Sequence, residues 1–373
     1  MASLFTSLYP RSHGVLHGFA LAREVHGQEM LDSSLVTLAE ALKRNGYVTF
    51  GVAGTGHVSR QAGMTNGFDH LTELWFTQNP SLHNALLDLK SSLRKTSSPF
   101  FLWVHYFNPH SPYNARKPWI DHYARHPKQT EEFASKQMEW LQTQIPRIKD
   151  NPDIIETLVD LYDSEINYTD SYIKRLFDEV LPTKNTLVII TADHGEAFMD
   201  HGLLGHANSL FEEELRIPLI IIPPASTKFK ASAVSGAVCN IDIYPTILNY
   251  LRIEQPSPLQ GQSLSSLLDG NPPPTDRVIF AELDRGQSLK SVAIGNWKLI
   301  ADPAGRKPLM LFDLASDPKE ARNILEEQPE VAARLNGELD RWMDRTEPFT
   351  APRGTVHLTP EQEKTLKSLG YLK

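Results

Sequence analysis

The pair Asp193-His194 is the part of this sequence best suited to chemistry. It follows the apolar run 186–191 and precedes Gly195, which lets the backbone turn sharply. A carboxylate and an imidazole at the end of a strand can both face a divalent cation. In the alternative interpretation Asp193 caps the next helix and His194 packs beneath it, and the residues alone leave both interpretations open.

Two further histidines follow apolar runs of the same kind. The run 100–107 ends in Asn108-Pro109-His110-Ser111-Pro112, a stiffened turn that makes His110 a candidate catalytic residue. His57 lies just beyond the run 47–53 and is a weaker candidate.

A glycine-rich loop, residues 200–206, adds two more histidines. His206 could donate to a substrate oxygen or protonate a leaving group. We interpret His201 as a solvated loop histidine. His105 lies inside an apolar run and is interpreted as a satisfied core histidine.

The elements that must position these residues alternate between short apolar runs and helical patterns, which is typical of an α/β fold with a mostly parallel central sheet flanked by helices. The expected strands are 47–53, 100–107, 186–191 and 218–222. The expected helices are 33–44, with Asp32 or Ser33 as N-cap, 153–181, and 240–253 interrupted by Pro245. Ligands bind at the carboxyl ends of such strands, where the histidine-bearing turns begin.

The pattern changes after a Pro/Ser/Gly-rich connection. We expect a large α/β domain over 1–271 and a small C-terminal α+β region over 272–373. Antiparallel strands are expected at 277–282, at 290–301 around the Gly295-Asn296 turn, and at 309–314, followed by a helix at 329–344.

Composition narrows the class of protein. The net charge is −8, with 22% charged residues and no basic stripe, which argues against nucleic acid as the main partner. A single cysteine, Cys239, excludes an intrachain disulfide framework, and no 18-residue apolar stretch predicts a membrane span. The start of the chain lacks a signal-peptide pattern, which favours the cytoplasm, although a truncated chain could have lost such a peptide.

Several segments resemble the sulfatase family of the alkaline phosphatase superfamily. The segment TLVIITADHGEAFMDHGLLGHANSLFEEELRIPLIII is similar to the central segment of sulfatases. PFFLWVHYFNPHSPY, CNIDIYPTILNYLRIEQPSPLQGQSLSSLL and LFDLASDPKEARNI resemble other family segments, so that the likeness covers nearly the whole chain.

The resemblance implies a role for each matching residue. Asp193 and His194 become ligands of a divalent metal, for which calcium, magnesium and manganese are the candidates. His110 contacts the sulfate or the leaving oxygen, and His57 matches the histidine that hydrogen-bonds the nucleophile. The implied partner is a small anionic ester, with Thr55 and Asn108 as candidate substrate-binding residues.

Two departures from the family pattern keep other activities open. Thr55 and His206 stand where many sulfatases place lysines, which reduces the fixed positive charge available to a sulfate group. Phosphonate monoester and phosphodiester hydrolases of the same superfamily are similar in this respect. A catalytically inactive, sulfatase-like fragment is the third alternative.

The opening residues resemble the family segment immediately after the catalytic nucleophile. Aligning Ala2-Ser3-Leu4 with this segment places the nucleophile four residues upstream of Met1, together with the family's first strand. We therefore expect an N-terminally truncated chain. Ser3, Thr6 and Ser7 are expected to cap or pack a helix rather than to replace the nucleophile.

Overall fold

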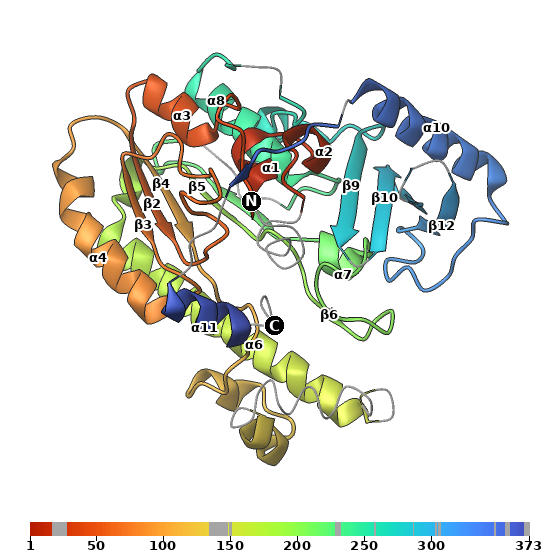
Figure 1. Cartoon of the computed structure of the whole chain (residues 1–373), viewed down its shortest axis with the longest axis horizontal. Coiled ribbons are helices and arrows are strands. Elements are labelled where there is room, and N and C mark those ends of the chain that lie inside the picture. Colours follow the sequence, from red (N-terminus) through yellow and green to blue (C-terminus); the bar gives the residue numbers. More distant parts are fainter. Residues whose placement is uncertain are drawn as a thin grey trace.

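The computed structural model of this chain is an α/β protein with a separate antiparallel sheet at one side (Figure 1). The structure describes residues 1–16, 28–133, 148, 151–227, 233–256, 259–285, 287–302, 304, 307–346, 348–354 and 359–368.

Two groups of strands form the α/β part. In the first, β2 (Val48–Ala53) lies between β3 (His70–Glu73) and β4 (Phe100–His105), and both pairings are parallel. In the second, β5 (Val188–Thr191) pairs antiparallel with β8 (Leu219–Ile222). The predicted fold class is confirmed, and the run that begins at Pro218 forms the strand that runs antiparallel.

Helices cover both faces of these strands. On one side lie α4 (Asn79–Lys95) and α6 (Pro152–Arg175), and on the other lie α1 (Ala2–Thr6), α3 (Leu38–Arg44) and α8 (Ile243–Leu251) (Figure 1). The packed side chains show the same layers. Phe50 and Val52 of β2 share a core with Leu82, Leu86 and Leu93 of α4, while Leu38 and Leu42 of α3 pack on Tyr244 and Leu248 of α8.

Helix α3 begins later than its sequence pattern predicts. Its N-cap is Thr37, not Asp32 or Ser33. The Thr37 hydroxyl accepts a hydrogen bond from the Glu40 N–H, and the Glu40 carboxylate accepts one from the Thr37 N–H. This reciprocal capping box fixes the start of the helix at that position.

The C-terminal sheet has the strand order β12-β11-β10-β9, with all pairings antiparallel. Its strands are β9 (Val278–Arg285), β10 (Gln287–Ile294), β11 (Trp297–Ala301) and β12 (Pro308–Asp313). Helix α10 (Pro329–Arg345) covers one face through Leu335 and Leu339, which pack on Val292 and Leu299. The strands and helix expected here are confirmed, and the boundary at residue 272 stays a prediction.

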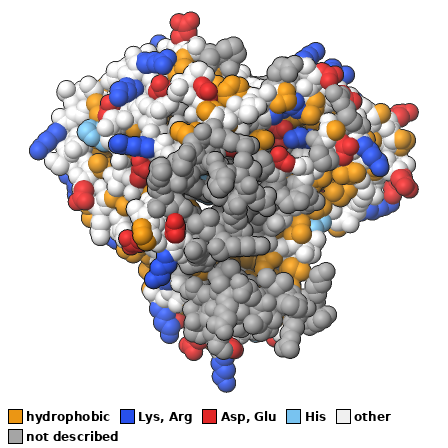
Figure 2. Space-filling model, viewed as in Figure 1, with side chains coloured by type: hydrophobic (Ala, Val, Ile, Leu, Met, Phe, Trp, Pro, Cys, Tyr) orange, Lys and Arg blue, Asp and Glu red, His pale blue; other side chains and the backbone are white. Residues whose placement is uncertain are grey.

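The remaining elements are short. They are α2 (Pro10–His13), β1 (Gln28–Glu29), η2 (Trp119–His122), η4 (Leu176–Val180), η5 (Thr183–Asn185), β6 (Ala197–Phe198), β7 (Leu204–Gly205), α7 (Glu212–Leu215), η6 (Asn240–Asp242), α9 (Ser265–Leu268), β13 (Arg353–Gly354) and α11 (Pro360–Ser368). None of the helices among the described residues is long and apolar enough to span a membrane. On the face in Figure 2, acidic and basic side chains alternate over the coloured surface, in keeping with the absence of a basic stripe in the sequence.

Candidate active site

Three strand ends deliver polar residues to one cavity of about 1580 Å³. Its lining includes Thr55 and His57 after β2, Asn108 and His110 after β4, and Asp193 and His194 after β5, together with Glu196 and His206 from the following loop. All seven residues that the sequence singled out for the site therefore line a common space.

Asp193 lines this cavity, and its side chain is 38% exposed. Its Oδ1 lies 3.9 Å from Nε2 of His194, whose Nδ1 is 2.8 Å from the Gly195 carbonyl. Nδ1 can donate to that carbonyl, and Nε2 is the ring nitrogen nearer the carboxylate. Burial acts to raise the pKa of Asp193, but nearby His194, His105 and the N-terminal ammonium outweigh it and hold this pKa below its ordinary value.

His206 is oriented by a carboxylate. Its Nδ1 lies 2.8 Å from Oε2 of Glu196, while the Tyr113 hydroxyl donates to Oε1 of the same carboxylate at 2.8 Å. Burial acts to raise the pKa of Glu196, but the hydrogen bond and charge of His206 prevail and lower it. The His206 ring stacks on the His194 ring, with centroids 4.0 Å apart.

His110 completes the group of imidazoles. Its ring centroid is 4.9 Å from that of His206 and 6.4 Å from that of His194. Its Nδ1 lies 2.6 Å from the Ser111 carbonyl. Burial lowers the pKa of His110 to about 4, and that of His57 also to about 4, so both rings are neutral near pH 7.

The two predicted substrate-binding residues, Thr55 and Asn108, are more buried than Asp193 and His194. Thr55 is 5% exposed, and its hydroxyl accepts a hydrogen bond from the His57 N–H at 3.3 Å. Asn108 is 3% exposed and donates through Nδ2 to Glu165 at 2.7 Å. Both residues border the cavity, and their contact with substrate stays a prediction.

Sequence reasoning missed two residues of this site. Glu196 has a signal in its spacing, since it lies two positions after His194 in the same turn. His105 was interpreted as a satisfied core histidine, yet it lines the cavity, and its buried Nδ1 has no hydrogen-bond partner among the described residues. The structure ends β4 at His105, whereas the apolar run of the sequence continues to Phe107, so no signal in the sequence placed His105 at the strand end.

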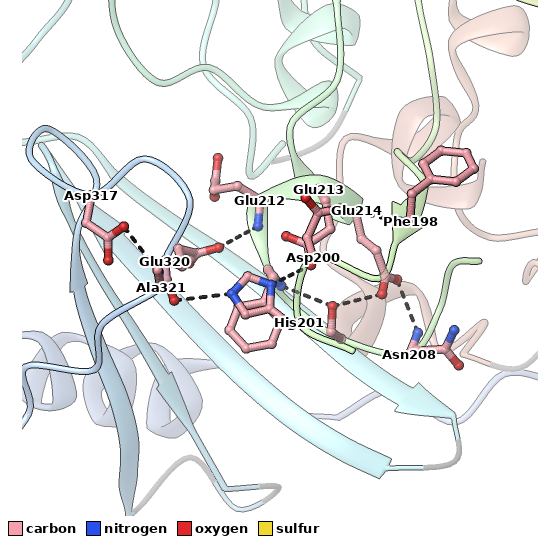
Figure 3. A network of polar contacts seen from close by, with 12 residues as sticks. Phe198, Asp200, His201, Asn208, Glu212, Glu213, Glu214, Asp317, Glu320 and Ala321 are labelled. Carbon is pink, nitrogen blue, oxygen red and sulfur yellow. Dashed lines mark hydrogen bonds and ion pairs between the residues drawn. The ribbon is translucent and has the colours of Figure 1, made fainter. Parts of the chain in front are cut away.

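The interpretation of His201 as a solvated histidine was wrong. Its side chain is 16% exposed and stacks on Phe211, with centroids 3.6 Å apart. Nδ1 lies 2.6 Å from Oε1 of Glu213, and Nε2 lies 3.2 Å from the carbonyl oxygen of Glu320. Figure 3 shows the ring between these two segments. Its contacts thus join the loop that carries His206 to the C-terminal region.

Gly195 must be a glycine for a steric reason. A Cβ at this position would lie 2.1 Å from the carbonyl oxygen of Glu213, and the Gly195 N–H donates to the Glu214 carbonyl at 2.8 Å. The turn after β5 is therefore pressed against α7, which fixes the direction in which His194 leaves the strand.

The hydroxyl groups of α1 serve the fold. Thr6 donates to the Ala2 carbonyl at 2.9 Å, and Ser7 donates to the Ile241 carbonyl at 2.6 Å. Ser3 Oγ lies 2.9 Å from Nε2 of His13, whose Nδ1 accepts a hydrogen bond from the Val15 N–H. With Nδ1 used as an acceptor, the neutral His13 carries its proton on Nε2 and donates to Ser3, so it does not act as a base toward that hydroxyl.

A family comparison covers the part of the chain that carries this site. Residues 1–253 match the family model described as Sulfatase. The chain belongs to the sulfatase family. Residues 200–345 match a second model, described as the C-terminal part of N-sulphoglucosamine sulphohydrolase.

Individual sulfatases align with parts of the chain. Arylsulfatase K of Mus musculus is 35% identical over 42% of this chain and 30% of its own length. An uncharacterized sulfatase of Escherichia coli K12, YidJ, is 24% identical over 75% of this chain and 58% of its own. Choline-sulfatase of Rhizobium meliloti is 27% identical over 71% of this chain and 53% of its own length. The chain thus spans between 30% and 58% of the length of these relatives.

Solved structures share the fold. The phosphonate monoester hydrolase of Agrobacterium radiobacter superposes with a TM-score of 0.70 at 20% identity, covering 96% of this chain and 88% of its own. The structure of BT4656 in complex with its substrate D-glucosamine-2-N,6-O-disulfate superposes with a TM-score of 0.69 at 18% identity, covering 93% of this chain and 88% of its own. At these identities the likeness establishes the architecture.

Proposed function

We propose that residues 1–373 carry the metal and substrate sites of a sulfuric ester hydrolase whose nucleophile lies upstream of Met1. The observation that carries the proposal is the meeting of Asp193, His194, His110 and His206 in one cavity of a sulfatase-family chain. A phosphonate monoester substrate is the second candidate, because Thr55 and His206 replace the lysines expected for sulfate.

The donor set fits a divalent cation. Asp193 offers an ionised carboxylate within the cavity, and Nε2 of His194 faces it. The trio His194, Glu196 and His206 also has ligand atoms within 4.8 Å of one another. We assign Asp193 and His194 as ligands, since both Glu196 oxygens already accept hydrogen bonds from Tyr113 and His206. When bound, the cation would neutralise the non-bridging oxygens of the ester and lower the pKa of an oxygen nucleophile.

We assign different roles to the two remaining histidines, His206 and His110. Glu196 orients the His206 ring through Nδ1, and we assign Nε2 of His206 to pass a proton to the departing alcohol. His110 is neutral near pH 7, with Nδ1 directed to the Ser111 carbonyl, so we assign it to contact with the transferred group rather than to proton donation.

Metal binding tests the ligand assignment in residues 1–373 without any need for turnover. Calorimetric titration with Mn²⁺, Mg²⁺ and Ca²⁺ should show at least about tenfold weaker binding for Asp193→Asn, and an effect on the same scale for His194→Ala. Asp200→Asn changes a carboxylate in the same loop outside the cavity lining, and should bind as the unaltered chain does. Unchanged affinity in Asp193→Asn, or a larger loss in Glu196→Gln, rejects the assignment.

Activity requires a chain that includes the upstream nucleophile. A panel of an aryl sulfate, a phosphonate monoester and a phosphodiester should give the highest kcat/KM on the aryl sulfate, with turnover abolished in Asp193→Ala. A preference for the phosphonate selects the second candidate. Turnover that survives Asp193→Ala refutes the proposed metal site.

A further inference from the structure

Glu165 of α6 is a buried carboxylate that lies outside the cavity of the candidate active site. Its side chain is 0% exposed, and it does not line the cavity. Burial raises the pKa of Glu165, although the charge of Arg116 opposes the rise. A carboxylate in such a place is costly unless its oxygens accept hydrogen bonds. The groups that donate to Glu165 therefore indicate which part of the protein it stabilises.

The donors to Glu165 among the described residues all come from the loop that carries His110. Oε2 accepts a hydrogen bond from Nδ2 of Asn108 at 2.7 Å. Oε1 accepts from the Asn114 N–H at 2.9 Å and from Nε of Arg116 at 3.2 Å. One carboxylate thus contacts the loop on both sides of His110.

The Asn108 amide extends these contacts to a second helix. Its Nδ2 donates to Glu165, and its Oδ1 accepts from the Asn79 N–H at the start of α4 at 3.4 Å. Asn108 is 3% exposed. Both polar ends of this amide are hydrogen-bonded within the protein, so Asn108 ties the loop to α4 and α6 together.

We propose that Glu165 is a positioning residue for His110. It holds residues 108–116, which we call the His110 loop, so that the His110 ring stays in the cavity with its centroid 4.9 Å from that of His206. Oε2 serves Asn108 and Oε1 serves Arg116, so Glu165 does more than balance the charge of Arg116. The inference rests on the proposed function for the role of His110, whereas the contacts of Glu165 are independent of it.

Chemical modification of histidine tests the proposal in residues 1–373. Diethyl pyrocarbonate acylates neutral imidazoles, and peptide mass spectrometry gives the rate at each histidine. Glu165→Gln keeps the volume, but whichever way the new amide lies, one donor of the His110 loop meets another donor. His110 should then react at least about tenfold faster than in the unaltered chain, while the buried His13 should react at the same rate. An unchanged rate at His110 overturns the proposal.

Two further variants separate positioning from general loosening of α6. Asn108→Asp combined with Glu165→Gln exchanges donor and acceptor across the contact, so the rate at His110 should return to within about threefold of the unaltered chain. Asp160→Asn neutralises another buried carboxylate of α6, which accepts from the Arg125 N–H at 2.7 Å and from Nε of Arg125 at 2.8 Å. This control should leave His110 unchanged. Failure of the paired variant to recover, or equal acceleration in Asp160→Asn, contradicts the positioning role.

Turnover distinguishes this inference from the proposed function. In a chain that contains the upstream nucleophile, Glu165→Gln should lower kcat/KM on an aryl sulfate at least about tenfold. Added to His110→Ala, it should lower kcat/KM by less than about twofold, because the group that it positions is already gone. Additive losses would show that Glu165 does not act through His110. Absence of turnover in the unaltered chain counts against the proposed function, while the histidine reactivities still decide whether Glu165 holds the His110 loop.

Discussion

A buried ammonium, Lys298 on β11, provides the sharpest test of how the two parts of the protein are joined. It is 2% exposed, and its Nζ lies 2.8 Å from Oε1 of Glu212 and 2.8 Å from Oε1 of Glu320. Glu320 is fully buried, whereas the Glu212 side chain keeps 26% exposure. Lys298→Met keeps most of the aliphatic volume and removes the charge.

The expected loss of unfolding free energy follows from the carboxylate that is left behind. Removing one partner of a buried ion pair costs about 3–5 kcal/mol, because the other charge stays desolvated. Glu212 can be rehydrated, so the cost arises chiefly at Glu320, and we expect about 3 kcal/mol. This is a substantial part of the ~5–15 kcal/mol that stabilises a typical domain. Urea denaturation followed by tryptophan fluorescence measures it.

The pH dependence of the unfolding free energy tests whether Glu320 is the source of the loss. Burial raises the pKa of Glu320, and the charge of Lys298 opposes that rise. Without the ammonium the folded pKa rises further, so the carboxyl is protonated at a higher pH and its burial then costs less. The loss caused by Lys298→Met should therefore be smaller at pH 5 than at pH 8.

Two control variants complete this test. Lys174 forms an exposed pair with Asp178, and Lys174→Met should change stability by no more than about 0.5 kcal/mol. Adding Glu320→Gln to Lys298→Met should recover most of the loss, since no buried charge then remains. A loss below about 1 kcal/mol for Lys298→Met, or one that does not vary with pH, refutes the argument.

The other predictions concern the same junction and the turn after β5. Burial opposes protonation of His201, but its hydrogen bonds to Glu213 and the Glu320 carbonyl prevail and raise its pKa. The resulting stability is present below the ordinary pKa and is lost as pH rises through the raised one. The Tm advantage over His201→Gln should therefore shrink from pH 6 to pH 8, and parallel curves would contradict this. Gly195→Ala should cost about 2 kcal/mol or more in urea and weaken Mn²⁺ binding, because its Cβ would meet the Glu213 carbonyl; a stable variant that binds Mn²⁺ normally would show that the turn can move.

The strands and their carboxyl ends were predictable because short apolar runs bounded by turn residues carry most of the signal. Each apolar run that precedes one of the candidate residues forms a strand. Asp193, His110 and His57, which follow these strands, line one cavity. The direction of each strand was harder to predict from the sequence. β8 runs antiparallel to β5, but its four residues are all apolar although Ile220 and Ile222 are exposed, so it lacks the apolar/polar alternation that is typical of an antiparallel strand.

The remaining differences depend on contacts between distant residues. Asp32 and Ser33 are suitable N-caps by type, but Thr37 also has Glu40 three residues later, and that pair determines the start of α3. His201 is enclosed because Glu320, more than a hundred residues away, accepts from its ring. No local pattern around a loop histidine contains such information.

The C-terminal region is connected to the candidate active site through the contacts of α7. Lys298 donates to the carboxylate of Glu212 at the start of this helix, and His201 is hydrogen-bonded to the carboxylate of Glu213. The Gly195 N–H donates to the Glu214 carbonyl. Three consecutive glutamates thus link β11, the loop of His206 and the turn of His194. A change at Lys298 that weakens stability should therefore also weaken divalent-metal binding, although Lys298 does not line the cavity. Metal affinity that stays constant in Lys298→Met under native conditions would show that α7 holds the turn without help from the C-terminal sheet.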